Sequence, residues 1–122
     1  MSTPAVDHDA LVQLLDGNPE LILTIVDSFL GDCSDYMESI RYAVEEEDGT
    51  VLEQEAHGLK GAAGSLRAHP VSEAAQELEE AGHSGDFSDA ESALETLEQE
   101  VGRLKEELRA LREECKEELT EG

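Results

Sequence analysis

A regular spacing of apolar residues in the last third of the chain constrains the fold most. From residue 90 to residue 115 these residues alternate in steps of four and three, which is the spacing of one face of a long α-helix. They are Ala90, Leu94, Leu97, Val101, Leu104, Leu108, Leu111 and Cys115. A helix with such a stripe must bury it against other helices. The spacing predicts a last helix over residues 88–119, about 48 Å long at a rise of 1.5 Å per residue.

The composition favours helices along the rest of the chain as well. Leu, Ala and Glu are good helix formers and are abundant here, whereas the sequence has only two Phe, two Tyr and no Trp. Strands prefer aromatic and β-branched residues. The length of 122 residues is usual for one domain. We therefore expect a single all-α domain, in which the helices before the last one cover residues 7–15, 19–47, 51–68 and 72–81.

The charge excludes several classes of partner. The chain has 31 acidic and 8 basic residues, so its formal net charge is −23. Nucleic acids and anionic membranes attract basic surfaces, so we expect neither as a partner.

The sequence has no apolar run long enough to span a bilayer, and its N-terminus lacks the features of a signal peptide. Two cysteines, Cys33 and Cys115, do not suggest a disulfide framework. These features predict a cytoplasmic location.

Residues 57–70 differ from the rest of the chain. They contain no acidic residue, and three glycines, Gly58, Gly61 and Gly64, interrupt a helical pattern. Each glycine costs about 1 kcal/mol relative to alanine inside a helix. His57 lies beside them. A stretch in which glycines lower helix stability and acidic residues are absent around one histidine indicates a functional surface.

A helical wheel, at about 100° per residue, predicts how this surface is arranged. The apolar residues of the segment fall on the side opposite His57, so the histidine is expected to be exposed in the middle of the helix. The small residues Gly61, Gly64 and Ala68 fall on the same side as the histidine. Lys60 lies one turn further along. This layout leaves room for another molecule to approach the imidazole and places a cation near an anion attached to it.

The residues from Ala56 to Leu66 closely resemble the motif of histidine-containing phosphotransfer (Hpt) domains of bacterial phosphorelays. The motif is a histidine, then Leu-Lys-Gly, then a run of small residues with a second glycine. The resemblance covers about residues 7–105 and implies an antiparallel four-helix bundle preceded by a short cap helix. Outside this range, the sequence predicts a disordered start over residues 1–6 and a C-terminal extension of the last helix over residues 106–122, about which the family pattern says little.

The resemblance also implies a function. His57 would accept a phosphoryl group from the aspartyl phosphate of a receiver domain and pass it to another receiver. Such a protein is a relay without kinase activity of its own, and the Mg²⁺ would come with the receiver. Receiver domains of response regulators and a hybrid sensor kinase are the implied partners. The implied site residues are His57, Lys60 and, as a further hydrogen-bonding candidate, Gln54, with a partner-binding surface of Gly61, Gly64, Ser65 and Ala68.

Two other interpretations stay open at this point. The apolar seam of the last helix is also typical of an acidic helical adaptor or coiled-coil scaffold without covalent chemistry, and it predicts self-association through that helix. A surface histidine without a function is common, and His8, His69 and His83 are interpreted in this way. The sequence has no cluster of carboxylates, histidines and cysteines spaced for a metal site, which argues against an autonomous enzyme.

Overall fold

Local signals in the sequence define the helix starts. In the computed structural model, which describes residues 4–121, the side chain of Asn18 accepts hydrogen bonds from the backbone N–H groups of Glu20 and Leu21. Asp48 accepts one from Val51 in the same way. Side chains that accept from the first free N–H groups stabilise a helix start. The helices are α1 (His8–Leu14), α2 (Pro19–Glu46), α3 (Gly49–Ser65), α4 (His69–Ser84) and α5 (Ala90–Glu121).

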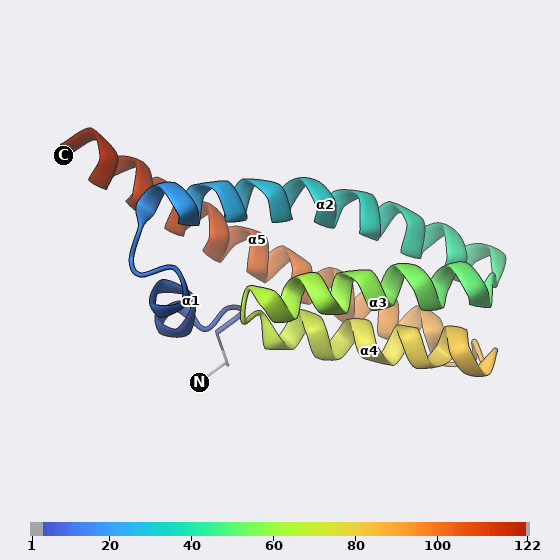
Figure 1. The fold of residues 1–122 in the computed structure, drawn as a ribbon. Coiled ribbons are helices and arrows are strands. Elements are labelled where there is room, and N and C mark those ends of the chain that lie inside the picture. The colour runs from blue at the N-terminus through green and yellow to red at the C-terminus, as the bar shows by residue number, and fades with distance from the viewer. Residues whose placement is uncertain (1–3, 122) are drawn as a thin grey trace.

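The four longer helices form an antiparallel bundle. Each of α2, α3 and α4 packs against the next helix, and α5 closes the bundle against α2 (Figure 1). The short α1 lies at the end of the bundle beside the turn between α3 and α4 (Figure 1). There the N–H of Asp7 donates to the carbonyl of Arg67 at 3.0 Å. The predicted all-α fold, a four-helix bundle with a short cap helix, is confirmed. Among the described residues, no helix has both the length and the apolarity needed to cross a bilayer.

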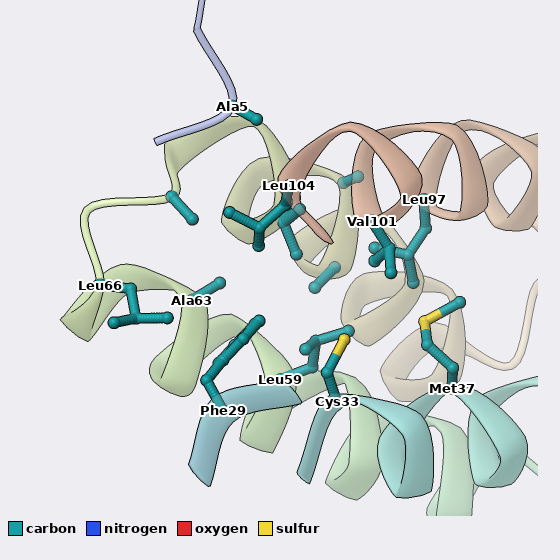
Figure 2. Packing of buried hydrophobic residues seen from close by; sticks show 14 of the residues in the cluster. Ala5, Phe29, Cys33, Met37, Leu59, Ala63, Leu66, Leu97, Val101 and Leu104 are labelled. Carbon is teal, nitrogen blue, oxygen red and sulfur yellow. The ribbon is translucent and has the colours of Figure 1, made fainter. Parts of the chain in front are cut away.

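The core is built from the apolar faces of all the helices. Figure 2 shows Phe29, Cys33 and Met37 of α2 near Leu59 of α3 and Leu97 of α5. Most of the predicted seam of the last helix is buried here: Ala90, Leu97, Val101, Leu104, Leu108, Leu111 and Cys115. The seam therefore packs within the chain, against the other helices of the same bundle.

The turn between α3 and α4 comes three residues earlier than predicted, at residues 66–68. The sequence prediction extended the third helix to residue 68 and started the fourth at residue 72, because a proline disfavours helix in the residue before it. In the structure α3 ends at Ser65, Arg67 adopts a left-handed φ of 62°, and α4 begins at His69. Pro70 lies in the first turn of α4, where its missing N–H removes no helical hydrogen bond.

The N-terminal segment packs on the bundle. The prediction of a disordered start over residues 1–6 is wrong for Ala5 and Val6, which are buried. Their backbone N–H groups donate to the two carboxylate oxygens of Glu107, at 2.7 Å and 3.1 Å. Residues 1–3 of that prediction lie outside the described residues. One carboxylate on α5 thus satisfies two backbone donors and holds the chain that leads into α1.

Most of the predicted C-terminal extension, residues 106–122, belongs to the bundle. Leu108, Leu111 and Cys115 are buried, and Arg112 Nη1 lies 3.2 Å from the Asp27 carboxylate of α2. Only the last turns of α5 project past the start of α2 (Figure 1), where Leu119 is 41% exposed. A domain boundary at residue 105 therefore has no counterpart in the packing, and residue 122 lies outside the described residues.

Candidate functional site

His57 projects from the middle of α3 on the face opposite the core. Its side chain is 69% exposed, whereas its neighbours Ala56 and Leu59 are fully buried. The ring nitrogen Nδ1 lies 3.1 Å from Oε2 of Glu79 on α4. Because a carboxylate can only accept a hydrogen bond, this contact places the proton of the neutral ring on Nδ1. The lone pair then lies on Nε2, which makes Nε2 the nucleophilic nitrogen.

Glu79 joins His57 to the predicted cation. Its other oxygen, Oε1, lies 2.6 Å from Nζ of Lys60, and the two side chains are 22% and 30% exposed. The hydrogen bond from Lys60 is the main cause that lowers the pKa of Glu79, and the hydrogen bond from His57 adds to it, against the opposing effect of burial. Glu79 is therefore a carboxylate at neutral pH. The site is a triad in which one anion lies between an imidazole and an ammonium group.

The register of the α3–α4 hairpin brings these side chains together. His57 and Glu79 are equally far from Ala68 along the chain, and so are Glu53 and His83, whose side chains also meet, at 2.9 Å. In an antiparallel helix pair, residues equidistant from the turn lie opposite each other. The sequence analysis missed Glu79, and this symmetry about the turn is the signal that finds it.

The glycines behave differently from one another. Gly61 is exposed, and a Cβ added there would meet nothing within 4 Å, which confirms that this position is open beside His57. Gly64 is half-buried, and a Cβ there would lie 3.8 Å from the Ser72 hydroxyl. A Cβ at Gly58 would lie 2.6 Å from the ring of Tyr36 on α2. Gly61 is thus the glycine that clears the surface, and Gly58 permits close packing of α2 on α3.

The remaining predicted site residues divide into exposed and buried ones. Ser65 is exposed, and its hydroxyl donates to the carbonyl of Gly61 at 3.1 Å. Gln54 is exposed too, but the imidazole Nδ1 of His57 donates its hydrogen bond to Glu79 instead. The placement of Ala68 on the histidine surface is wrong, because Ala68 is fully buried as the residue before α4. The wheel assumed that α3 continues through residue 68, and the chain turns after Ser65.

The other histidines lie outside this triad. His83 is 80% exposed and paired with Glu53 in a groove of about 460 Å³ between α3 and α4, which Lys60 and Glu79 also line. His69 is exposed at the start of α4, and the side chain of His8 lies outside the described ones. Within the part of the chain that the structure describes, no three His, Cys, Asp or Glu side chains gather as a metal site.

An exposed histidine with its Nδ1 beside a carboxylate, a lysine one turn away and an open glycine all lie on one face of a four-helix bundle. The model of the Hpt domain family matches residues 24–114, which is more than half of the chain. This chain therefore belongs to the Hpt domain family. It is a histidine phosphotransfer protein of two-component phosphorelays.

The fold has a counterpart among solved structures. The crystal structure of histidine-containing phosphotransfer protein B (HptB) from Pseudomonas aeruginosa PAO1 superposes with a TM-score of 0.75. The match covers 99% of each chain, at 24% sequence identity. At this identity, the likeness shows the same fold. No curated protein matches the sequence of this chain.

Proposed function

We propose that His57 is the phosphoacceptor, which takes a phosphoryl group from the aspartyl phosphate of one receiver domain and passes it to another. The observation that carries this proposal is the 69% exposed imidazole whose Nδ1 faces Glu79, beside the open position at Gly61. The lone pair of Nε2 attacks phosphorus, the bond from phosphorus to the aspartyl oxygen breaks, and the bonding electrons leave with the aspartate. The second transfer is the reverse of this step.

Lys60 would neutralise the phosphoryl oxygens. Phosphoryl transfer depends mainly on positioning and on charge stabilisation, and the ammonium group can supply the second. Its Nζ now lies 2.6 Å from Glu79. When His57 is phosphorylated, the ammonium group of Lys60 would therefore leave the Glu79 carboxylate and contact the phosphoryl oxygens.

The partners follow from the surface around the histidine. Receiver domains, including that of a hybrid sensor kinase, would approach over Gly61, Gly64 and Ser65, where side chains are small. Gln54 would lie at the other edge of this surface. The receiver brings the Mg²⁺, and the chain has no kinase activity of its own. A cytoplasmic location is part of this proposal, since receivers and kinase domains act there.

The scaffold interpretation has less support. Most of the apolar seam that suggested it, from Ala90 to Cys115, is buried within the bundle, and Leu94 is partly buried. Self-association through the last helix is a proposal only for its exposed end near Leu119, which is 41% exposed. Sedimentation of the full chain and of a Leu119→Glu variant tests it. A monomer in both samples contradicts self-association.

The experiment that tests the main proposal uses the full chain, a phosphorylated receiver domain and Mg²⁺. We expect an acid-labile phosphate on the unmutated protein and none on His57→Gln, with equal helicity by circular dichroism because the imidazole lies outside the core. His83→Gln is the matched control, since it removes the other exposed, Glu-paired histidine of the same groove. Acceptance of phosphate by His57→Gln would contradict the proposal.

A further inference from the structure

We propose that the hydroxyl of Tyr36 on α2 donates a hydrogen bond to the receiver domain that docks over His57, and that this contact strengthens docking. The inference rests on the proposed function and concerns a residue outside the motif of α3. Tyr36 does not touch phosphorus. It is a recognition residue, and its partner is an oxygen acceptor on the surface of the receiver.

The phenol of Tyr36 occupies the place of a side chain next to His57. A Cβ added at Gly58, the residue after His57, would lie 2.6 Å from Cε1 of Tyr36, 2.9 Å from its hydroxyl oxygen and 3.0 Å from Cζ. These atoms are the far end of the tyrosine side chain. Because α2 and α3 pack side by side (Figure 1), α2 supplies the group that α3 lacks at this position.

The hydroxyl of Tyr36 is a free donor. Tyr36 is partly exposed, whereas Cys33 and Met37 on the same helix are buried. The hydroxyl makes no hydrogen bond to any other residue that the structure describes. Its oxygen is also not shut off from solvent, unlike the unpartnered Nε of Arg112. A hydroxyl in this position can form a hydrogen bond with an incoming protein without giving up one inside the bundle.

The pairing of Gly58 with Tyr36 lowers helix stability, so packing alone does not account for it. Glycine is a poorer helix former than alanine, and the ring of Tyr36 is what excludes a Cβ at residue 58. A smaller apolar residue at position 36 would leave room for alanine there, and phenylalanine would make the same carbon contacts as tyrosine. What tyrosine adds is the hydroxyl, presented one residue from His57.

The position of the phenol fits the path of a receiver. Around α3, Gly61 lies about 40° from His57 and about 60° from Gly58, and it lies between them. A receiver that enters over Gly61 therefore has the imidazole on one side and the phenol on the other. On the α4 side of the imidazole, the charged groups of the triad already pair with each other. Tyr36 is the neutral donor on the α2 side.

The test uses the full-length unmutated chain and two variants that each lose one hydroxyl, Tyr36→Phe and Tyr42→Phe. Tyr42 is the matched control, because it lies on the same helix, is 59% exposed and points about 240° around α2 from Tyr36. Rates of transfer are measured against the concentration of a phosphorylated receiver with Mg²⁺. They are measured separately with phosphoramidate, a small phosphoryl donor that has no protein surface.

For Tyr36→Phe we expect the KM for the receiver to rise by about threefold to tenfold, which is the effect of one neutral hydrogen bond. The kcat should stay unchanged, since loss of a contact that is present throughout docking raises KM alone. The rate with phosphoramidate and the melting temperature should also equal those of the unmutated protein, because the hydroxyl has no partner inside the bundle. Tyr42→Phe should match the unmutated protein in every assay.

Gly58→Ala adds a second arm to the test. Its Cβ would displace the ring of Tyr36, so we expect a higher KM for the receiver and an unchanged rate with phosphoramidate. Because the hydroxyl is then out of place, Tyr36→Phe should cause no further rise when it is added to Gly58→Ala.

An unchanged KM for Tyr36→Phe would overturn the inference, as would an equal rise in Tyr42→Phe or fully additive effects of Tyr36→Phe and Gly58→Ala. A slower reaction of Tyr36→Phe with phosphoramidate would also overturn it, because the hydroxyl would then act on the phosphoryl group instead of the receiver. An unmutated protein that forms no phosphohistidine at His57 with either donor contradicts the proposed function itself. Normal labelling of His57 with an unchanged KM for Tyr36→Phe removes only this inference.

Discussion

At the scale of single residues, Gly61 and Gly102 form a natural pair for comparison. Both are exposed in helix interiors, and a Cβ added at either would meet nothing within 4 Å. Replacement of either by Ala should raise stability by up to about 1 kcal/mol, because alanine is the better helix former. Gly61→Gln should also fold well, but its side chain would occupy the space beside His57 that a receiver must enter.

We therefore expect opposed effects for Gly61→Gln: an equal or higher melting temperature and a much slower phosphoryl exchange. A displacement of about 1 Å in the reacting groups can cost on the order of a hundredfold in rate. Gly102→Gln should match its stability and exchange at the normal rate. Thermal melts and transfer from a phosphorylated receiver measure both quantities. A stable Gly61→Gln that exchanges normally would show that the open position does not serve transfer.

Glu79 gives a prediction for the pH dependence of stability. Its pKa is lowered in the folded protein, mainly by Lys60, so the folded state favours the carboxylate. The resulting stability is present above the ordinary value of 4.5 and is lost as pH falls through the lower folded value. The unmutated protein should melt above Glu79→Gln at pH 7, by about 1 kcal/mol or less because the pair is partly exposed. The difference should begin to shrink as pH falls below 4.5 and should vanish below the lowered pKa of the folded state, and a constant difference would contradict this.

The residue scale also shows what a wheel can and cannot predict. It correctly placed His57 and Gly61, because both lie well inside one regular helix. It could not separate Gly58 from Gly61, since the contact of Gly58 with Tyr36 comes from another helix. It misplaced Ala68, because the wheel has no information on where the helix ends. Glu79 was missed because its place beside His57 depends on the register between two helices, which the spacing within one helix does not contain.

At the scale of the elements, the α3–α4 hairpin depends on two glycines at its open end. A Cβ at Gly82 would lie 2.6 Å from the backbone nitrogen of Glu53 and 2.7 Å from the carbonyl oxygen of Gly49. Backbone atoms cannot move aside as a side-chain end can, so the helices would have to separate. We expect Gly82→Ala to cost about 1–3 kcal/mol, measured by urea unfolding. Gly102→Ala is the control, and an equally stable Gly82→Ala would contradict the close approach.

The last helix, α5, shows how one sequence pattern fits two assemblies. Its seam could be buried between chains or within one chain, because both need the same spacing of apolar residues. The structure buries Leu108 within the bundle, whereas Leu119 on the same helix is 41% exposed. Leu108→Ala should therefore cost about 2–5 kcal/mol in urea unfolding. Leu119→Ala should change the free energy of unfolding little, and equal costs for both would mean that the seam is not buried inside the chain.

The existence and the order of the helices could be predicted from the sequence. Helix caps, prolines and the spacing of apolar residues are signals that lie within or next to each helix. The side chain of Asn18 is such a signal, because it accepts hydrogen bonds from the first N–H groups of α2. The packing of Ala5 and Val6 could not be predicted, since it depends on a carboxylate of Glu107 that is distant in sequence. The burial of the C-terminal half of α5 could not be predicted either, because this half packs against α2, which is distant in sequence.

At the scale of the whole molecule, charge is the dominant feature. The net charge of −23 is compressed into one small bundle, and the ion pairs that the structure shows involve few of the 31 acidic residues. Repulsion among the remaining carboxylates favours the expanded, unfolded chain. Salt shortens its range, from about 30 Å at 0.01 M to about 10 Å at 0.1 M ionic strength.

We therefore expect the melting temperature to rise between 10 mM and 150 mM NaCl. A rise of roughly 4 °C would correspond to about 1 kcal/mol for a domain of this size. Two exposed residues outside the α3–α4 hairpin, Glu45 and Glu117, offer positions at which the net charge can be changed as a control. A Glu45→Lys/Glu117→Lys variant is less acidic and should show a smaller rise, with phosphoryl acceptance at His57 unchanged. Added salt weakens both the repulsion among carboxylates and the attraction within each ion pair. A melting temperature that falls with added salt would therefore mean that the ion pairs contribute more to stability than the net charge costs.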